Sequence, residues 1–443
     1  MDLRCPKCRT INKIPDHLKP NVALRCGKCH STFLVEKPKT KSNHVWRSMV
    51  TMVTKPYCYV TFCIACFAIA LTLGWIRIGS VNGISPDSIT YINAAQAIRA
   101  NGISSVFNLS GFGPLYPLSI AGLTYFGFGF EQAARLVTVL CFALLMFPIF
   151  FLGKTVRGVS TGYLACLVCL AFWPLWCVAL MAWTEMLYIL LSTLAVLFLV
   201  KFSESREAKT VTLFFSGLFV TLAVATRFIG LSILVVGLIV IAIKNKSRLR
   251  KTLYQMLFFG FTGLFVLILW IYEKAGFAGN LGGYVLVRAP EAFSQNVFSA
   301  VRILVGDFYV NRILNYPTFQ LVALVSITLL GAYALARLAG VKGLRRYLSK
   351  DYVVLIYIFV YSFLIIWMTS MVYSFGVSSR YLTPIYPFMI LAAISFLIFV
   401  FRQIRGIKEK QAIFYIITLF LLIFLLRSAY HSSLLLGLLG VNP

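Results

Sequence analysis

Long apolar runs alternate with short polar segments over most of the chain. From residue 57 onward, these runs have about the length that a helix needs to cross the hydrocarbon core of a bilayer. Eleven of them are predicted to be transmembrane helices: 57–76, 132–153, 161–180, 185–200, 210–226, 228–243, 253–272, 318–336, 352–372, 384–401 and 411–427. The pattern therefore predicts an all-α polytopic membrane protein with a transmembrane domain at 57–427 and a tail at 428–443.

One further apolar run, 114–130, is predicted to lie along or dip into the outer face of the membrane instead of crossing it. With this run left out, the loops on one side hold 19 Lys and Arg, and the other side holds about ten. The basic loops begin at Lys154, Lys201, Lys244, Arg337 and Arg402. Because basic loops stay in the cytoplasm, this topology places the N-terminus inside and the loops 77–131 and 273–317 outside.

The polar head, residues 1–35, carries two Cys-x-x-Cys pairs. Cys5 and Cys8 form the first pair, and Cys26 and Cys29 form the second, 17 residues further on. Four thiolates at this spacing supply a closed tetrahedral shell for a structural Zn²⁺. The head resembles the small, β-rich zinc ribbons at the N-termini of many bacterial proteins. That resemblance implies reduced thiols in the cytoplasm, with either a docking role or a plain folded cap.

Other groups of possible metal ligands are interpreted differently. His17 and His30 are alternative ligands in the head, where the four cysteines already suffice. Two further cysteine pairs with metal-like spacing lie in predicted transmembrane helices, Cys63 with Cys66 and Cys166 with Cys169. Cysteine packs in such helices as a small hydrophobic residue, so these pairs are predicted to belong to the core.

The basic composition does not indicate a nucleic-acid partner. The chain is 60% hydrophobic, with a mean hydropathy of +0.87 and a formal net charge of +28. Of its 41 Lys and Arg, 12 lie in the first 55 residues and most others lie in short loops between apolar runs, as topology signals do. The Lys-rich linker 36–56 is predicted to face anionic lipid at the surface of the bilayer.

A short polar stretch in the first outer loop has the signals of a helix start. Ser85 is a predicted N-cap, and Pro86 fits the first helical position. The helix should run to about residue 100 and stop at Asn101-Gly102. Asp87 then lies in the first turn, where the helix dipole favours a carboxylate. By position alone, this residue is either a capping acid or a preorganised functional carboxylate.

Four stretches of the chain resemble motifs of the GT-C glycosyltransferases, which are polytopic enzymes that use polyprenyl-phosphate sugars. They are Asp87-Ser88-x-x-Tyr91, Gly113-Pro114-Leu115-Tyr116-Pro117-Leu118, Ala225-Thr226-Arg227-Phe228-Ile229-Gly230 and Arg380-Tyr381-Leu382-Thr383-Pro384-Ile385-Tyr386-Pro387. The likeness covers about 57–427 and implies GT-C-like outer loop helices and an outward-facing active site with Asp87 as the catalytic carboxylate. Many relatives carry two adjacent acids, whereas Ser88 follows Asp87 here. This difference leaves single-base chemistry open and the need for a divalent cation undecided.

The residues in these stretches suggest an inverting sugar transfer. Asp87 would accept the proton of an acceptor hydroxyl as that hydroxyl attacks the anomeric carbon. Arg380 and Arg227 would bind the leaving lipid phosphate, since guanidinium groups match phosphate oxygens; interfacial snorkelling is the alternative for both. Tyr91 and Tyr381 are further candidate substrate contacts, and packing under the loop helix is an equal alternative for Tyr91.

Other charged residues on the predicted outer side have a weaker claim to a role. Glu185, at the start of a predicted span, is either a second polar contact or a buried capping acid, and the capping acid is the simpler interpretation. Arg288, Arg302 and Arg312 either grip a lipid headgroup or acceptor, or contribute surface charge.

The expected function is a membrane glycosyltransferase that moves a sugar from a polyprenyl-phosphate donor to a lipid, glycan or protein acceptor on the extracytoplasmic face. The expected location is a bacterial cytoplasmic membrane, with an archaeal source as the alternative. A transporter or flippase of a lipid-linked precursor is a rival, although no convincing internal repeat supports it. A lipid-linked glycan polymerase or ligase, and an inactive relative kept as a zinc-ribbon scaffold, are the other two.

Overall fold

The structure is a computed structural model, and it describes most of the chain. The described residues are 2–4, 11–13, 23–26, 28–34, 55–78, 84–102, 105, 113–205, 210–275, 293–308, 344–371 and 378–403. The chain divides into two compact units, Met1–Tyr59 and Val60–Pro443. The two units are taken separately below.

The first unit contains two short antiparallel hairpins. β1 (Asp2–Arg4) pairs with β2 (Ile11–Lys13), and β3 (Ala23–Arg25) pairs with β4 (Thr32–Leu34). The described part of the head is therefore β-structured, as the sequence predicts.

The second Cys-x-x-Cys pair lies at the turn of the β3–β4 hairpin. The Cys26 N–H donates to the Ser31 carbonyl at 3.0 Å, and the His30 N–H donates to the Cys26 carbonyl at 3.0 Å. His30 takes a positive φ of 55°, which closes the turn. Cys5 and Cys8 lie outside the described residues. Within the described parts of the chain, no group of three or more His, Cys, Asp or Glu side chains is arranged to hold a metal ion. The zinc site therefore stays a prediction.

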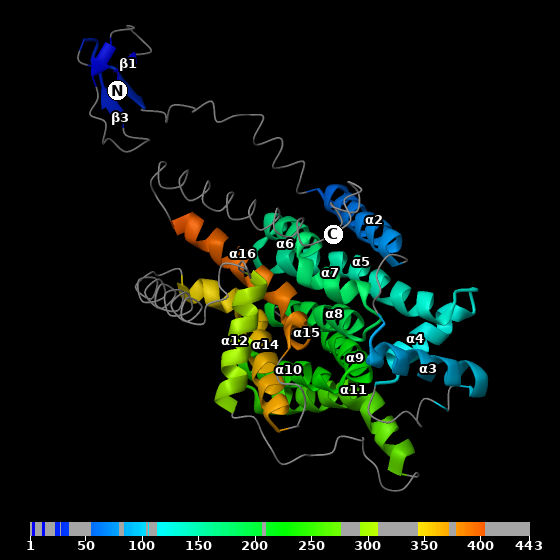
Figure 1. The fold of residues 1–443 in the computed structure, drawn as a ribbon. Helices are drawn as coiled ribbons and strands as arrows, with labels where there is room; N and C mark the ends of the chain where they lie inside the picture. The colour runs from blue at the N-terminus through cyan, green and yellow to red at the C-terminus, as the bar shows by residue number, and fades with distance from the viewer. Residues whose placement is uncertain are drawn as a thin grey trace. The chain divides into compact units, whose positions relative to one another are not determined.

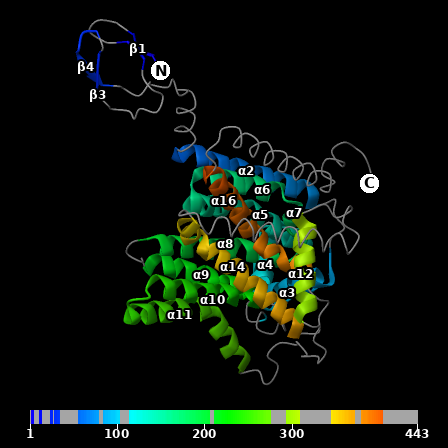
Figure 2. The same ribbon diagram turned by 90° about the vertical axis from the view of Figure 1, so that its left-hand side faces the viewer.

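The second unit is built of helices in its described parts (Figure 1). In chain order the helices are α2 (Pro56–Ile78), which starts at the boundary between the units, α3 (Pro86–Asn101), α4 (Leu115–Thr124), α5 (Phe130–Arg157), α6 (Val159–Ala171), α7 (Trp173–Leu180), α8 (Glu185–Glu204), α9 (Thr210–Thr226), η2 (Phe228–Gly230), α10 (Leu231–Lys244), α11 (Leu249–Ala275), α12 (Phe293–Phe308), α14 (Leu344–Met371), α15 (Ser379–Leu382), η3 (Thr383–Ile385) and α16 (Tyr386–Gln403). Helix α8 is the centre of the bundle, with α5 and α9 packed along it, as two views show (Figures 1 and 2).

Several of these helices are long and apolar enough to cross a membrane. Among the described residues there are six: Pro56–Ile78, Phe130–Arg157, Glu185–Glu204, Leu249–Leu269, Asp351–Ser370 and Ser379–Phe399. Helices α6 and α7 make a seventh if the pair, bent by 59°, is one span. The structure therefore confirms a polytopic helical architecture. The predicted runs 318–336 and 411–427 lie outside the described residues, so the count of eleven stays a prediction.

One predicted span differs in shape from the single helix that the sequence predicts. The run 161–180 is not one straight helix but α6 and α7, and the break falls just before Trp173-Pro174. Pro174 lacks the N–H that a continuous helix would bond to the carbonyl four residues earlier, and its ring would clash with that carbonyl, which explains why α6 stops and a new helix begins. Helices α9 and η2–α10 are shorter than the other candidate spans.

Helix α4 covers most of the apolar run that was predicted not to cross. It has ten residues and is therefore about 15 Å long, half the thickness of the hydrocarbon core. It packs between α3 and α5, where the buried Tyr116 hydroxyl donates to the Ala134 carbonyl at 3.0 Å. Its length agrees with a helix that does not span the bilayer.

Small residues let the spanning helices approach one another closely. A Cβ on Gly153 of α5 would lie 2.9 Å from the Gly162 Cα of α6, and one on Gly217 of α9 would lie 2.1 Å from the Thr262 Oγ1 of α11. Inside lipid there is no hydrophobic force that drives helices together, so close packing at small residues stabilises their association instead. These contacts bring α5 against α6 and α9 against α11.

A buried polar cluster joins three helices at one end of the bundle. Arg157, at the end of α5, pairs with Asp351 of α14 and also donates from Nε to the Ser395 hydroxyl of α16 at 2.8 Å. The Ser395 hydroxyl donates to Asp351 Oδ1 at 2.7 Å. The side chain of Asp351 is 1% exposed. We call these three residues the α5–α14–α16 cluster.

Candidate active site

Helix α3 begins where the sequence predicts. Ser85 is the N-cap, and its hydroxyl accepts from the Ser88 N–H at 3.2 Å. The Ser85 N–H donates back to the Ser88 hydroxyl at 3.2 Å, which completes a capping box. Pro86 opens the helix, and Gly102 ends it with a φ of 84°. The capping role that the sequence left open for Asp87 thus belongs to Ser85 and Ser88.

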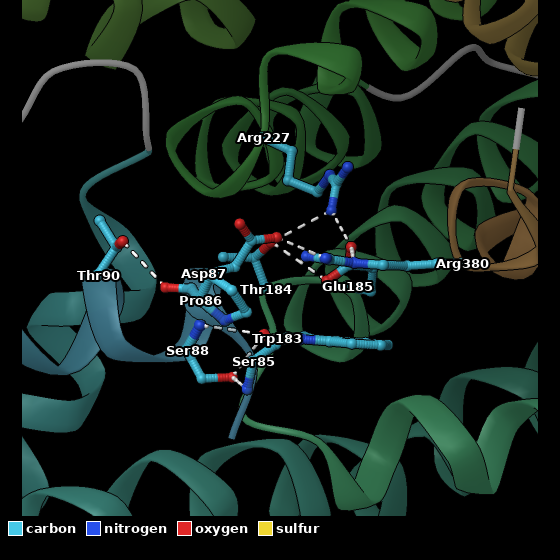
Figure 3. Close-up of polar contacts among 10 residues, drawn as sticks. All are labelled: Ser85, Pro86, Asp87, Ser88, Thr90, Trp183, Thr184, Glu185, Arg227 and Arg380. Atoms are coloured by element: carbon cyan, nitrogen blue, oxygen red, sulfur yellow. Dashed lines mark hydrogen bonds and ion pairs between the residues drawn. The ribbon is translucent and has the colours of Figure 1, made fainter. Parts of the chain in front are cut away.

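Asp87, in the first turn of α3, faces an arginine from the far end of the chain. Its Oδ2 lies 2.5 Å from NH1 of Arg380, which belongs to the short helix α15 (Figure 3). The side chain of Asp87 is 41% exposed, whereas that of Arg380 is 18% exposed. The predicted base therefore stands at the rim of the site, with one side open to solvent.

Glu185 is the carboxylate at the centre of the cluster. It is the first residue of α8, and its side chain is fully buried. Its Oε1 accepts from Nε of Arg380 and also from NH1 of Arg227 (Figure 3). A capping acid is the simpler expectation from the sequence, but the buried carboxylate also pairs with two arginines. Glu185 fixes both predicted phosphate-binding arginines.

Arg227 reaches Glu185 from a break between two helices. Its backbone is extended between α9 and η2, and NH1 also donates to the Thr184 hydroxyl at 3.3 Å. The chain turns so tightly after Arg227 that a Cβ on Gly230 would lie 2.7 Å from the Val224 nitrogen. Glycine at this position therefore allows the turn that aims Arg227 into the site.

Trp183 is a second residue that the sequence analysis passed over. Its indole N–H donates to the Ser85 hydroxyl at 2.8 Å, and the guanidinium of Arg380 stacks 4.1 Å from the centre of its ring. A cation held over an indole face is attracted by the ring quadrupole. Trp183 thus ties the cap of α3 to Arg380. Its position two residues before the acid of a predicted span was the available signal.

The two predicted tyrosine contacts are placed differently. Tyr91 is 3% exposed and lies under α3, with its ring 5.3 Å from that of Tyr116 in an edge-on contact. Burial, together with the nearby Glu185 carboxylate, raises the pKa of Tyr91 to about 12, so the hydroxyl stays neutral. Tyr91 packs as the alternative interpretation expects, and a substrate contact by its hydroxyl stays a prediction. Tyr381 places its ring 5.8 Å from the guanidinium of Arg227.

Gly113, at the start of the second motif stretch, packs against the break between α9 and η2 that carries Arg227. A Cβ on Gly113 would lie 2.4 Å from the Ala225 carbonyl oxygen and 2.5 Å from that of Thr226, so only glycine fits. The four motif stretches, far apart in sequence, therefore meet at one end of the bundle. This end of the bundle lies opposite the α5–α14–α16 cluster. Helices α5 and α14 run along the bundle, and only one end of each helix belongs to that cluster.

Arg302 lies on α12 and is exposed. Arg288 and Arg312 lie outside the described residues. Arg380 lies between the carboxylates of Asp87 and Glu185 and pairs with both of them. The two carboxylates therefore do not face a shared open position that an ion could occupy. This donor set does not fit a divalent cation.

No protein-family model matches the chain, and no curated protein matches it significantly. Among solved structures, the apo ArnT from Cupriavidus metallidurans is similar, with a TM-score of 0.54 and 15% identity, over 76% of this chain and 60% of that one. The same protein bound to undecaprenyl phosphate gives a TM-score of 0.53 and 15% identity, over 77% and 60%. An Archaeoglobus fulgidus oligosaccharyltransferase has a TM-score of 0.42 at 12% identity, over 83% and 53%.

The two ArnT structures show the class of fold. The chain shares the fold of ArnT over about three quarters of its own length. The chain spans about three fifths of the length of the ArnT structures that it matches.

Proposed function

We propose that the protein is a membrane glycosyltransferase of the GT-C type, which moves a sugar from a polyprenyl-phosphate donor to a lipid, glycan or protein acceptor. The observation that carries the proposal is the cluster of Asp87, Arg380, Glu185 and Arg227, at the point where all four motif stretches meet. The fold adds support, since ArnT has been crystallised with undecaprenyl phosphate.

The chemistry assigned to the cluster is a single displacement. The acceptor oxygen forms a bond to the anomeric carbon, and its proton passes to the Asp87 carboxylate. The bond between the anomeric carbon and the phosphate oxygen breaks, and its electron pair leaves with the lipid phosphate. Arg380 and Arg227 stabilise the charge on that phosphate. One displacement inverts the configuration at the anomeric carbon.

The proposed orientation puts this cluster on the extracytoplasmic side of a cytoplasmic membrane. Basic residues support it, because they gather at the other end of the bundle. They include Lys154, Arg157, Lys201, Lys244, Lys246, Arg248, Arg250 and Lys251. Basic ends of spans stay in the cytoplasm.

The proposed role of the head is a cytoplasmic zinc ribbon with Cys5, Cys8, Cys26 and Cys29 as ligands. The hairpin turn supports it, because Cys26 and Cys29 lie within one tight turn after β3. Four thiolates would make the Zn²⁺ structural. Metal analysis of the purified full chain should find one zinc per protein, and Cys26→Ser with Cys29→Ser should lose it. Full zinc retention in that double variant would reject these ligands.

A transfer assay tests the proposed function. Purified full-length protein in nanodiscs is given a panel of polyprenyl-phosphate monosaccharides with candidate acceptors. Turnover should depend on Asp87, and Asp87→Asn should abolish it. Glu131→Gln is the matched control, because Glu131 is also a first-turn acid, is 50% exposed and pairs with an arginine, Arg135, at 2.7 Å.

The outcomes of this assay separate the rival functions. Transfer that survives in Asp87→Asn would remove Asp87 as the base. Absence of transfer with every donor, together with movement of a lipid-linked sugar across proteoliposome membranes, would favour the transporter. Formation of long glycans from a lipid-linked oligosaccharide would favour the polymerase.

A further inference from the structure

The four residues at the centre of the site neutralise one another. Arg380 and Arg227 supply two positive charges, and Glu185 and Asp87 supply two negative charges in direct contact with them. A phosphate that enters this cluster adds a third anion to a half-buried site. Like charges held close together at low dielectric repel strongly. Binding of phosphate therefore requires one of the carboxylates to give way.

The two carboxylates differ in how easily they can leave. Glu185 is fully buried at the start of α8 and is bound to both arginines, so its release would strand a charge in the protein interior. Asp87 is 41% exposed and has one contact with Arg380. A rotation of its side chain places it in water at small cost. Asp87 is therefore the anion that can be exchanged.

Arg380 itself stays in place during such an exchange. The ring of Trp183 lies 4.1 Å from its guanidinium, and Glu185 holds its Nε. Only NH1, which faces the exposed rim, bonds to Asp87. When Asp87 moves away, NH1 of Arg380 is left as a preorganised hydrogen-bond donor, which suits a phosphate oxygen.

We propose that Asp87 occupies the place of the donor phosphate in the ligand-free protein, and that the incoming phosphate displaces it from Arg380. This inference rests on the proposed function and adds regulation to it. While Asp87 is paired with Arg380, its Oδ2 is held by the guanidinium and not by an acceptor hydroxyl. Donor binding releases this oxygen, so the whole carboxylate turns to the acceptor only when a donor is present. The exchange breaks no covalent bond and orders the reaction, with the donor first and the acceptor second.

A binding measurement tests the exchange without relying on turnover. Undecaprenyl phosphate, which carries no sugar, is titrated against the full-length protein in detergent micelles. Asp87→Asn removes the competing charge, and we expect it to bind this probe roughly three- to ten-fold more tightly than the wild type. Asp87→Ala, at the same exposed position, should behave alike. Arg380→Ala should lose most of the binding in both backgrounds.

Two controls isolate the phosphate and the position of the acid. Undecaprenol, which lacks the phosphate, should bind the wild type and Asp87→Asn equally. Glu131→Gln, which removes a matched acid elsewhere, should leave the affinity for undecaprenyl phosphate unchanged. Asp87→Glu keeps the charge and should bind like the wild type.

The results separate this inference from the proposed function. Equal or weaker binding of undecaprenyl phosphate by both Asp87→Asn and Asp87→Ala would overturn the exchange, even if transfer depends on Asp87. Tighter binding by these variants, with no transfer from any donor, would keep the exchange and reject sugar transfer. Tighter binding of undecaprenol as well would show a general change in lipid affinity and would also overturn the exchange.

Discussion

Two buried ion-pair clusters stand at opposite ends of the same helical bundle, and they are built differently. In the α5–α14–α16 cluster, one arginine meets one aspartate, and the Ser395 hydroxyl bonds to both. In the active-site cluster, two arginines share the buried Glu185, and one of them reaches outward to Asp87. The side chains of Arg157 and Asp351 in the first cluster are only 11% and 1% exposed, whereas the second cluster ends in a carboxylate that is 41% exposed.

The difference separates a structural role from a chemical one. A closed, fully paired cluster joins its helices and offers no group to a ligand. In an open cluster, a buried carboxylate holds the arginines in place, and the exposed carboxylate can be exchanged for a ligand. Under the proposed function, buried charge alone therefore does not distinguish the candidate active site; its exposed carboxylate, Asp87, does. The predictions below test this contrast, beginning with the largest expected effect.

Asp87→Asn should give the largest change. Loss of a general base costs about 10²–10⁴-fold in rate, and we expect transfer to fall by that factor. The unfolding temperature should change little, because Ser85 and Ser88 supply the helix cap. Initial rates of sugar transfer and a thermal melt in detergent measure the two properties. A large drop in melting temperature would mean that Asp87 acts structurally, like Asp351.

Asp351→Asn should produce the opposite pattern. It leaves Arg157 buried without its charged partner, and breaking such a pair costs about 3 kcal/mol in the free energy of unfolding. Transfer per folded molecule should equal that of the wild type, because the α5–α14–α16 cluster lies at the other end of the bundle. Melting curves and rates normalised to folded protein check this. A selective loss of transfer at full stability would break the comparison.

Arg380→Ala should mainly affect the donor. A hydrogen bond to a charged group contributes about 1.5–3 kcal/mol, so we expect the apparent donor affinity to fall roughly 10- to 100-fold. The affinity for the acceptor should change far less. Arg380→Lys keeps the charge but loses the planar fork, and should recover only part of the affinity. Steady-state kinetics with each substrate varied in turn give both constants. An unchanged donor affinity would remove Arg380 from the phosphate site.

The local part of the site was readable from the sequence. Ser85, Pro86, Asp87 and Gly102 carry their own signals for the start and end of α3, and these depend on neighbours within a few residues. The motif resemblance also identified Arg227 and Arg380 as candidate phosphate ligands. The helix signals were confirmed because the information lies in a short stretch, whereas the phosphate-binding role of the two arginines stays a prediction.

The partnerships within the site were not readable. Arg380 contacts Glu185 across 195 positions and Asp87 across 293, and no local pattern specifies which acid meets which arginine. Only the packing of α8, α9 and α15 brings them together. The bend between α6 and α7 was missed for a simpler reason, since the apolar run outweighed the local signal of Pro174. The sequence showed the elements of the site but not the central place of Glu185.

Trp183→Phe should give the smallest effect, and it tests how firmly Arg380 is held. Phenylalanine loses the indole bond to Ser85 and weakens the attraction for the guanidinium, each by about 0.5–1 kcal/mol. We therefore expect kcat/KM to fall roughly three- to ten-fold. Trp176→Phe is the matched control, because this buried indole also donates a hydrogen bond, to the Leu170 carbonyl at 2.6 Å, but lies outside the cluster. Equal losses of kcat/KM in both variants would assign Trp183 to general packing. A loss confined to Trp183→Phe would show that the open cluster works only while its inner arginine is kept rigid.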